Sequence, residues 1–320
     1  MDFKLDETQQ EIAALAADVL GRESDTPWKA LGEAGLLSLA VPERLGGDGL
    51  GVLETAVLLT EVGRRAADVP ALATLALGVL PIARHGTPEQ QDELLPLVTE
   101  QHGVLTAALS EPSHPLPASP ATTAGPDGIT GVKINVPYAT EARRILVSTD
   151  AGVFVVDPAQ PGVSTSDGTV RFDRARGDEL TGAAADLRRF ALAGACAVAD
   201  GVLAGALDLT VKHVGTRHQF GKPISTFQAA ASQVADVYIA ARTLHLAALT
   251  ACWSLDDNDL DTAAYWLAAE AMPAVHTCHH LHGGLGLDIT YPMHRYYGMA
   301  KELTRFVGGV EHRLGAIDVH

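Results

Sequence analysis

The feature that most constrains the fold is a polar corner at residues 217–228, which separates two long apolar-periodic segments. The segment before it, residues 186–215, is rich in glycine and alanine, and the segment after it, residues 228–253, repeats apolar residues at helical spacing. Gly221 and Pro223 are residue types that end one helix and let the next begin. The pattern therefore predicts two long helices joined by a short corner.

The corner also carries side chains that suit a particular kind of ligand. Arg217 offers a bidentate fork to a phosphate, and Phe220 offers a flat face on which a ring can stack. A cation, an aromatic ring and a glycine at one exposed turn can together hold an anionic ligand that contains a ring. The corner is therefore a candidate binding site.

The composition and charge exclude several classes of protein. The chain has 320 residues, enough for two or three packed subdomains with a sizeable core, and its formal charge of −16 argues against a nucleic-acid partner. Its three cysteines are widely spaced without a CxxC pair, and no basic-then-apolar signal pattern opens the sequence. No uncharged apolar run reaches the roughly 20 residues of a membrane span. We therefore expect a reduced, cytoplasmic protein with neither a nucleic-acid nor a membrane partner.

Three regions follow from the periodicity, and together they predict a mainly α protein with a small β domain. Residues 1–102 read as helices, with Thr87 capping one of them and Pro88 at its first position. Residues 103–184 contain short β-branched runs bounded by Gly, Pro or Asp, which predicts a reduced middle β domain. Residues 185–320 are helical again, in the pattern of a four-helix bundle with short loops.

Two sequence blocks resemble the acyl-CoA dehydrogenases, flavoproteins that desaturate acyl-CoA thioesters at the α,β bond. The first is the corner itself, which resembles the family's Arg-x-x-Phe-Gly-Lys-Pro-Ile hallmark. The second is His282-Gly283-Gly284-Leu285-Gly286, continuing to Arg295, which resembles the family's Gly-Gly-x-Gly segment at the expected distance. The resemblance implies the family's three-part fold, with an N-terminal helical domain, a middle β domain and a C-terminal four-helix bundle.

The resemblance also implies roles for individual residues. In this family the corner and the Gly-Gly-x-Gly segment reach across a dimer interface to the pyrophosphate and adenosine end of the neighbour's FAD. It implies FAD-binding roles for Arg217, Phe220, Gly283 and Gly284, and for His280, which stands where the family usually has a Gln. No metal site is implied.

Both positions that supply the family's catalytic base are empty in this chain. Desaturation needs a carboxylate to take the α-proton while the flavin takes the β-hydrogen. The Glu of the family's Y-E-G-T motif aligns with Val307, and the Glu of its D-L-E-R motif aligns with Arg188. The resemblance therefore implies that this chain lacks the base.

The motifs that receive the flavin ring are eroded as well. The family's T-E-P-x-A-G-S-D strand keeps only its opening, Ser110-Glu111-Pro112, and its K-x-W-I-T segment aligns with residues 133–137, where Pro137 replaces a hydroxyl donor. This chain keeps the residues that reach the neighbour's FAD and lacks the motifs that hold a flavin ring of its own. In this it resembles the shorter, non-catalytic subunit of the α2β2 acyl-CoA dehydrogenases that act on cholesterol side chains. The resemblance implies a base-bearing homologous partner that shares the FAD and binds most of the acyl-CoA, with an electron-transfer flavoprotein or similar acceptor.

Simpler interpretations stay open for most of these residues. Arg217 could be a surface ion-pairing residue, Phe220 could pack in the core, and the glycines could only cap a helix. Three acidic residues are candidate stand-in bases for a self-sufficient homo-oligomeric enzyme, and a flavin-free scaffold is a further alternative. A histidine-rich turn invites a metal interpretation, although it has no HExxH pattern. The stand-in bases are Asp288, Glu302 and Glu311, and the histidine-rich turn contains His276, Cys278, His279, His280 and His282.

Overall fold

The structure is a computed structural model and describes residues 3–317. It is mainly helical with a small β part, which confirms the predicted fold class. Contacts group the chain into two compact units that differ from the three predicted domains, whose boundaries stay a prediction. Unit 1 comprises Met1–Gly21, Ala56–Asp68 and Ala195–His320, and unit 2 comprises Arg22–Thr55 and Val69–Gly194.

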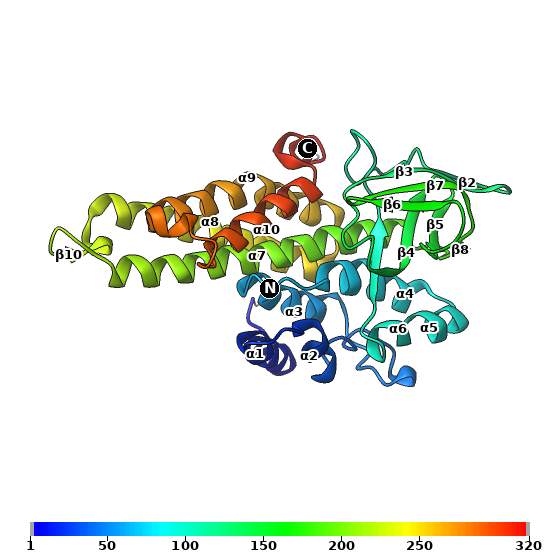
Figure 1. Cartoon of the computed structure of the whole chain (residues 1–320), viewed down its shortest axis with the longest axis horizontal. Coiled ribbons are helices and arrows are strands. Elements are labelled where there is room, and N and C mark those ends of the chain that lie inside the picture. Colours follow the sequence, from blue (N-terminus) through cyan, green and yellow to red (C-terminus); the bar gives the residue numbers. More distant parts are fainter. Residues whose placement is uncertain (1–2, 318–320) are drawn as a thin grey trace. The chain divides into compact units, whose positions relative to one another are not determined.

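The first hundred residues fold into short helices whose starts follow from their capping residues (Figure 1). The Asp6 carboxylate accepts a hydrogen bond from the Gln9 backbone N–H at 2.8 Å, and the Gln9 side chain accepts one from the Asp6 N–H. Thr87 and Gln90 form the same reciprocal box, with Pro88 as the first helical residue. The elements are α1 (Glu7–Gly21), α2 (Pro27–Glu33), η1 (Glu43–Leu45), α3 (Val52–Arg64), the π-helical η2 (Leu72–Val79), α4 (Leu80–His85), α5 (Pro88–Leu94) and α6 (Pro96–Thr99).

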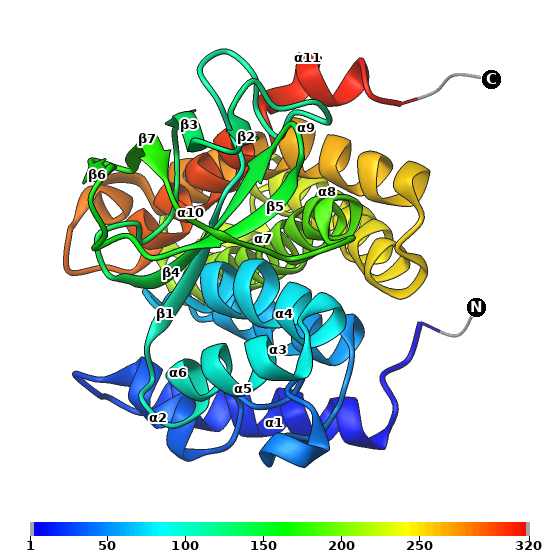
Figure 2. The ribbon, with the colours of Figure 1, turned by 90° about the vertical axis from the view of Figure 1, so that its right-hand side faces the viewer.

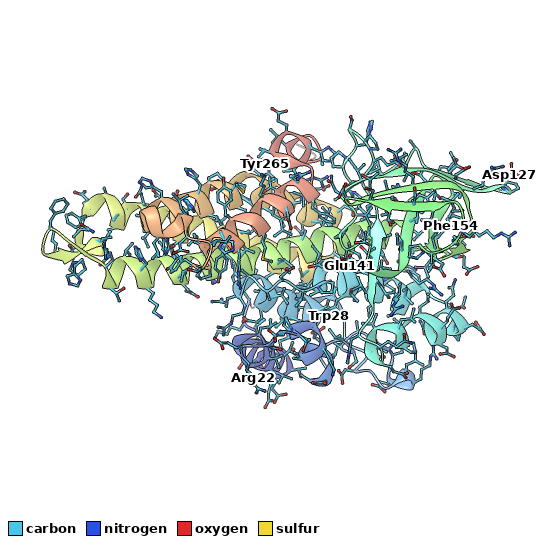
Figure 3. The ribbon with its side chains drawn as sticks, viewed as in Figure 1. Arg22, Trp28, Asp127, Glu141, Phe154 and Tyr265 are labelled. Atoms are coloured by element: carbon cyan, nitrogen blue, oxygen red, sulfur yellow. The ribbon has the colours of Figure 1, made fainter. Side chains whose placement is uncertain are left out.

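Two four-stranded sheets form the β part of unit 2. One has the order β1-β4-β5-β8, in which β1 and β4 are parallel, and the other has the antiparallel order β2-β3-β7-β6. Figure 3 shows Phe154 on β5 and Asp127 at the tip of the β2–β3 hairpin. Three of the β-branched runs predicted within residues 103–184, at 128–133, 144–148 and 152–156, lie on strands. The strands of the two sheets are β1 (Val104–Ala108), β2 (Thr123–Gly125), β3 (Gly128–Lys133), β4 (Ala142–Thr149), β5 (Gly152–Val156), β6 (Val163–Ser166), β7 (Thr169–Ala175) and β8 (Asp178–Glu179).

Long helices form the C-terminal part, visible end-on in Figure 2. The two predicted around the corner are confirmed within two residues as α7 and α8. Inside unit 1, α7 lies against α3 so closely that a Cβ on Gly201 would stand 1.9 Å from the Thr60 carbonyl oxygen. The elements are α7 (Ala184–Thr216), β9 (His218–Gln219), β10 (Lys222–Pro223), η3 (Ile224–Thr226), α8 (Gln228–Ser254), α9 (Asp257–His282), η4 (Gly283–Leu287), α10 (Met293–Phe306) and α11 (Gly309–Leu314).

Within residues 3–317, α7 is the single helix that is long and apolar enough to cross a membrane. Its apolar window is 89% buried inside the protein. Burial of this kind is typical of a core helix, and the glycine and alanine content of α7 serves close packing of helices.

Candidate functional site

The corner between α7 and α8 is a small β-hairpin rather than a direct step from helix to helix. β9 and β10 pair antiparallel, and the two-residue loop between them, Phe220 and Gly221, has φ values of 51° and 79°. Positive φ at both loop residues defines the tight primed turns of hairpins, and glycine adopts it without strain. The Ile224 N–H donates to the Arg217 carbonyl at 2.9 Å and closes the base of the hairpin. The loop therefore projects the Phe220 ring outward.

Both ligand-type side chains of the corner face solvent. Phe220 is 93% exposed, which excludes core packing. Its ring centroid lies 6.3 Å from that of Phe227, with the two rings edge to face. Lys222 lies 4.4 Å from the Phe227 ring centroid and adds a second positive charge beside the loop. Arg217 is exposed and forms no ion pair with any residue between 3 and 317. An aromatic face and an uncommitted guanidinium are thus available to a ligand or a partner.

The second block begins where α9 ends. Gly283 ends α9 with φ 58° and ψ −137°, which is not the conformation of a left-handed cap, although its positive φ is one that glycine adopts without strain. Gly284 has no such backbone requirement, and apart from the adjoining chain no atom lies within 4 Å of the position of a Cβ on either glycine. His280, one turn earlier, is exposed. The surface over Gly283 and Gly284 is therefore open to close approach by a ligand.

A stacked histidine pair joins the two blocks. His213 lies one turn before Arg217 on α7, and His282 lies immediately before Gly283 on α9. Their ring centroids are 4.5 Å apart with an interplanar angle of 25°, and His282 is buried with its Nδ1 2.8 Å from the Cys278 carbonyl oxygen. The pair brings the last turn of α7, four residues before Arg217, against the last residue of α9, which precedes Gly283.

His213 was missed by the sequence analysis. A lone histidine on a helix carries no local signal, because its partner His282 is 69 positions away in the sequence. The histidine-rich turn had been considered for metal binding instead. Among the described residues, no group of three or more His, Cys, Asp or Glu side chains is arranged to hold a metal ion.

The histidine pair predicts a pH dependence of stability. Burial lowers the pKa of His213, with Arg217 adding to it, and burial also lowers the pKa of His282, with the charges of His213 and His279 adding to it. The two imidazoles bind protons less readily in the folded protein than in the unfolded chain. The contribution of the histidine pair to the free energy of unfolding is therefore complete above pH 6.5 and is lost as the pH falls below it. We expect the free energy of unfolding to rise with pH through this window.

The measurement is chemical denaturation at several pH values between 5 and 8, for the unchanged chain and for His213→Gln. The variant should show a shallower pH dependence in this interval, because one of the two depressed histidines is gone. An unchanged slope would contradict the role given to the stack.

The two residues predicted to occupy the family's base positions, Val307 and Arg188, have side chains that accept no proton. Val307 is fully buried at the end of α10, followed by Gly308 and Gly309 with φ values of 93° and 81°. Arg188 is half-buried in the first turns of α7. The possible substitutes Asp288, Glu302 and Glu311 are all exposed, and hydrogen bonds from Thr290 lower the pKa of Asp288.

The remains of the flavin-strand motif serve the interior of unit 2. Ser110 is buried, and its Oγ accepts a hydrogen bond from the Leu116 N–H. Glu111 accepts from the backbone N–H groups of Ala121 and Thr122, and from the Lys133 ammonium at 2.8 Å. Burial alone would raise the pKa of Glu111, but these hydrogen bonds lower it to about 2. These hydrogen bonds therefore hold the loop between β1 and β2 in place.

A hollow of about 980 Å³ lies elsewhere in unit 2. Its lining comes from α5 and from the β2–β3, β5 and β8 regions, and contains none of the residues of the two blocks. Its Arg144 is engaged by Glu93 at 3.4 Å and Asp157 at 3.5 Å. The corner and the glycine block in unit 1 remain the candidate site.

The chain is mainly helical with a small β domain, and the corner and the glycine turn are exposed on unit 1. Two family models match it: the acyl-CoA dehydrogenase N-terminal domain over residues 6–102 and the acyl-CoA dehydrogenase C-terminal domain over residues 176–317. The chain belongs to the acyl-CoA dehydrogenase family. Members of this family bind FAD.

Individual relatives match along nearly the whole chain. Acyl-CoA dehydrogenase FadE28 of Mycobacterium tuberculosis is 47% identical, over 98% of this chain and 97% of its own length. FadE27 of the same organism is 32% identical, over 99% and 98%.

Two solved structures share the fold closely. One is a variant of the Tcur3481-Tcur3483 steroid ACAD, with a TM-score of 0.90, 34% identity, and coverage of 97% of this chain and 96% of that one. The other is the ChsE4-ChsE5 complex from Mycobacterium tuberculosis, with a TM-score of 0.89, 31% identity, and coverage of 98% and 97%. The resemblance found in the two sequence blocks is thereby confirmed for the family and for its steroid-type heteromeric members.

Proposed function

We propose that this chain is the non-catalytic subunit of a heteromeric FAD-dependent acyl-CoA dehydrogenase. It completes the FAD site of a homologous, base-bearing partner in an α2β2 assembly. One observation carries the proposal: the donating corner is intact and faces outward, while both base positions hold side chains that accept no proton. The exposed corner residues are Arg217 and Phe220. The residues at the two base positions are Arg188 and Val307.

The exposed residues fit the pyrophosphate and adenosine end of FAD. Arg217 has an uncommitted guanidinium suited to bidentate contact with phosphate oxygens, and Phe220 presents an exposed ring for the adenosine. Gly283 and Gly284 leave room for close approach, and His280 offers a polar group beside them. When bound, the flavin supplies the hydride-accepting chemistry, and this chain's part is to hold the cofactor's far end.

The partner is proposed to bind most of the acyl-CoA, since this chain lacks the base. The complexes named among the similar structures support a homologous partner. The similarity to a steroid acyl-CoA dehydrogenase supports a steroid or cholesterol side-chain CoA ester as the substrate. We further propose that the complex is cytoplasmic. Its electron acceptor would be an electron-transfer flavoprotein or a similar protein.

Neutralising the exposed acids tests whether this chain supplies a base. We expect Asp288→Asn, Glu302→Gln and Glu311→Gln, each made in the co-expressed complex, to retain turnover within about twofold. General acid–base catalysis by a positioned carboxylate contributes roughly 10²- to 10⁴-fold. The measurement is thioester-dependent bleaching of the flavin and steady-state turnover.

A loss of that size in one variant, with FAD content unchanged, would favour the rival reading of a self-sufficient enzyme with an unorthodox base. The matched control replaces the base-position glutamate of the partner, which should abolish turnover. If that replacement has no effect, the division of labour between the subunits is wrong.

A further inference from the structure

Three aromatic rings from separate segments of unit 1 contact one another. His213 lies in the last turn of α7, His282 is the last residue of α9, and Tyr291 lies two residues before α10. The ring centroids of His282 and Tyr291 are 5.2 Å apart with an interplanar angle of 51°, and those of the two histidines are 4.5 Å apart. Aromatic pairs at such distances attract each other beyond the effect of the area they bury. We call these three residues the ring cluster.

Backbone hydrogen bonds connect the ring cluster to Arg217. The Arg217 N–H donates to the His213 carbonyl at 2.8 Å, which continues the helical pattern of α7 by one residue. The Arg217 carbonyl in turn accepts from the Ile224 N–H at 2.9 Å. Residues four apart on a helix lie on the same face, one turn above each other. The position of the Arg217 backbone therefore follows the position of His213.

The ring cluster also closes the loop that begins with the two glycines. This loop covers residues 283–290, so the contact between the rings of His282 and Tyr291 joins its two ends. Within the loop, Leu287 is 78% exposed and Ile289 is 75% exposed. Because these two side chains face solvent, they do not fix the loop by packing. The position of the glycine backbone therefore depends on the joined ends.

We propose that His213 is a positioning residue for FAD: its stack on His282 holds the Arg217 turn and the glycine turn at the separation that FAD retention requires. The inference rests on the proposed function, because it concerns the same cofactor. His213 acts through Arg217 and Gly283, and it need not touch the cofactor itself. A flat ring at this position is what the role requires.

The same stack makes FAD retention sensitive to pH. Burial lowers the pKa of both imidazoles, and the charges of Arg217, of His279 and of the neighbouring imidazole add to this, whereas the carbonyl groups of Cys278 and Leu209 act in the opposite direction. Protonation of both rings would place two positive charges about 4.5 Å apart, which weakens the stack. Because the neutral pair holds the two turns, FAD should bind more weakly as the pH falls below 6.5.

The test measures the dissociation constant for FAD of the complex co-expressed with a base-bearing homologue, above pH 6.5, where both imidazoles are neutral. His213→Ala removes the ring and should weaken FAD binding roughly 3- to 10-fold, with the native mass unchanged. His213→Phe keeps a flat ring and should restore binding to within about twofold. His276→Ala removes an exposed histidine from α9, and as the matched control it should leave FAD binding unchanged.

The pH profile gives a second measurement, which needs no variant without a ring. Between about pH 5 and pH 7.5 the unchanged complex should lose affinity for FAD as the pH falls, and the His213→Phe complex should lose less, because one protonatable ring is gone. Affinity that rises as the pH falls would overturn the proposal, since the added charge would then attract the pyrophosphate. Equal FAD affinity in the His213→Ala and unchanged complexes would also overturn it, even if the variant unfolds more easily in urea, because the stack would then serve the fold alone.

Arg217→Ala separates this inference from the proposed function. If Arg217→Ala loses FAD while His213→Ala retains it, the inference fails and the proposed function stands. If both variants retain FAD fully, the proposed function fails and the inference fails with it.

Discussion

Replacing Arg217 with alanine in the co-expressed complex is expected to weaken FAD retention roughly 10- to 100-fold. The reason is that a hydrogen bond to a charged group contributes about 1.5–3 kcal/mol, and a bidentate guanidinium–phosphate contact falls in this range. Arg217 is exposed and unpaired among the described residues, so its removal should not disturb the fold of the chain. The measurement is bound FAD per complex after dialysis, together with the dissociation constant for added FAD.

Two further variants sharpen this prediction. Arg217→Lys keeps the charge without the fork, so it should retain flavin better than alanine and less well than arginine. Arg171→Ala removes another exposed arginine, on β7, and should leave FAD content unchanged. Equal flavin content in the Arg217→Ala and Arg171→Ala complexes would rule out a role for Arg217 in holding the cofactor and favour a flavin-independent scaffold.

Lys133→Met is expected to destabilise the chain by about 3–5 kcal/mol, the typical cost of removing one partner from a buried ion pair. Lys133 is fully buried, and its ammonium donates to Glu111, to the Leu109 carbonyl and to the Ser148 hydroxyl. Methionine leaves the Glu111 carboxylate buried without its cation. The measurement is the free energy of unfolding by urea, at a pH where Glu111 is ionised.

The same pair predicts an acid limb of the stability curve. Because the pKa of Glu111 is about 2 in the folded chain against an ordinary value of 4.5, its contribution is complete above pH 4.5 and is lost as pH falls toward 2. Lys29→Met is the matched control: Lys29 and Glu33 form an exposed i,i+4 pair, and its removal should cost at most about 0.5 kcal/mol. Equal destabilisation by the two lysine replacements would show that the buried pair contributes no more than the surface pair.

Local chemistry made much of the fold predictable from the sequence. The reciprocal cap of Thr87 and Gln90 was readable because both partners lie within one turn. The strand at residues 152–156 was readable from a β-branched run between Gly and Asp. The length of α7 followed from a long apolar stretch that ends before the corner. Each of these signals involves neighbours in the chain.

The features that escaped prediction depend on contacts between distant residues or on an atypical turn sequence. Phe220 and Gly221 form a hairpin loop that requires positive φ at both positions, and phenylalanine gives no hint of this, as asparagine would have done. The stack of His213 on His282 depends on how α7 and α9 end side by side. The buried ion pair of Lys133 with Glu111 joins residues 22 positions apart, so no local signal predicted it. For the candidate site, the sequence indicated which residues to examine but not how they are joined.

We propose that this chain supplies half of a shared FAD site and no catalytic base. This proposal is tested most directly by the flavin content and native mass of the chain purified alone and co-expressed with a base-bearing homologue. We expect colourless protein alone and a yellow heterotetramer with about one FAD per heterodimer in the co-expression. Stoichiometric FAD on the chain alone, bleached by an acyl-CoA thioester, would contradict it.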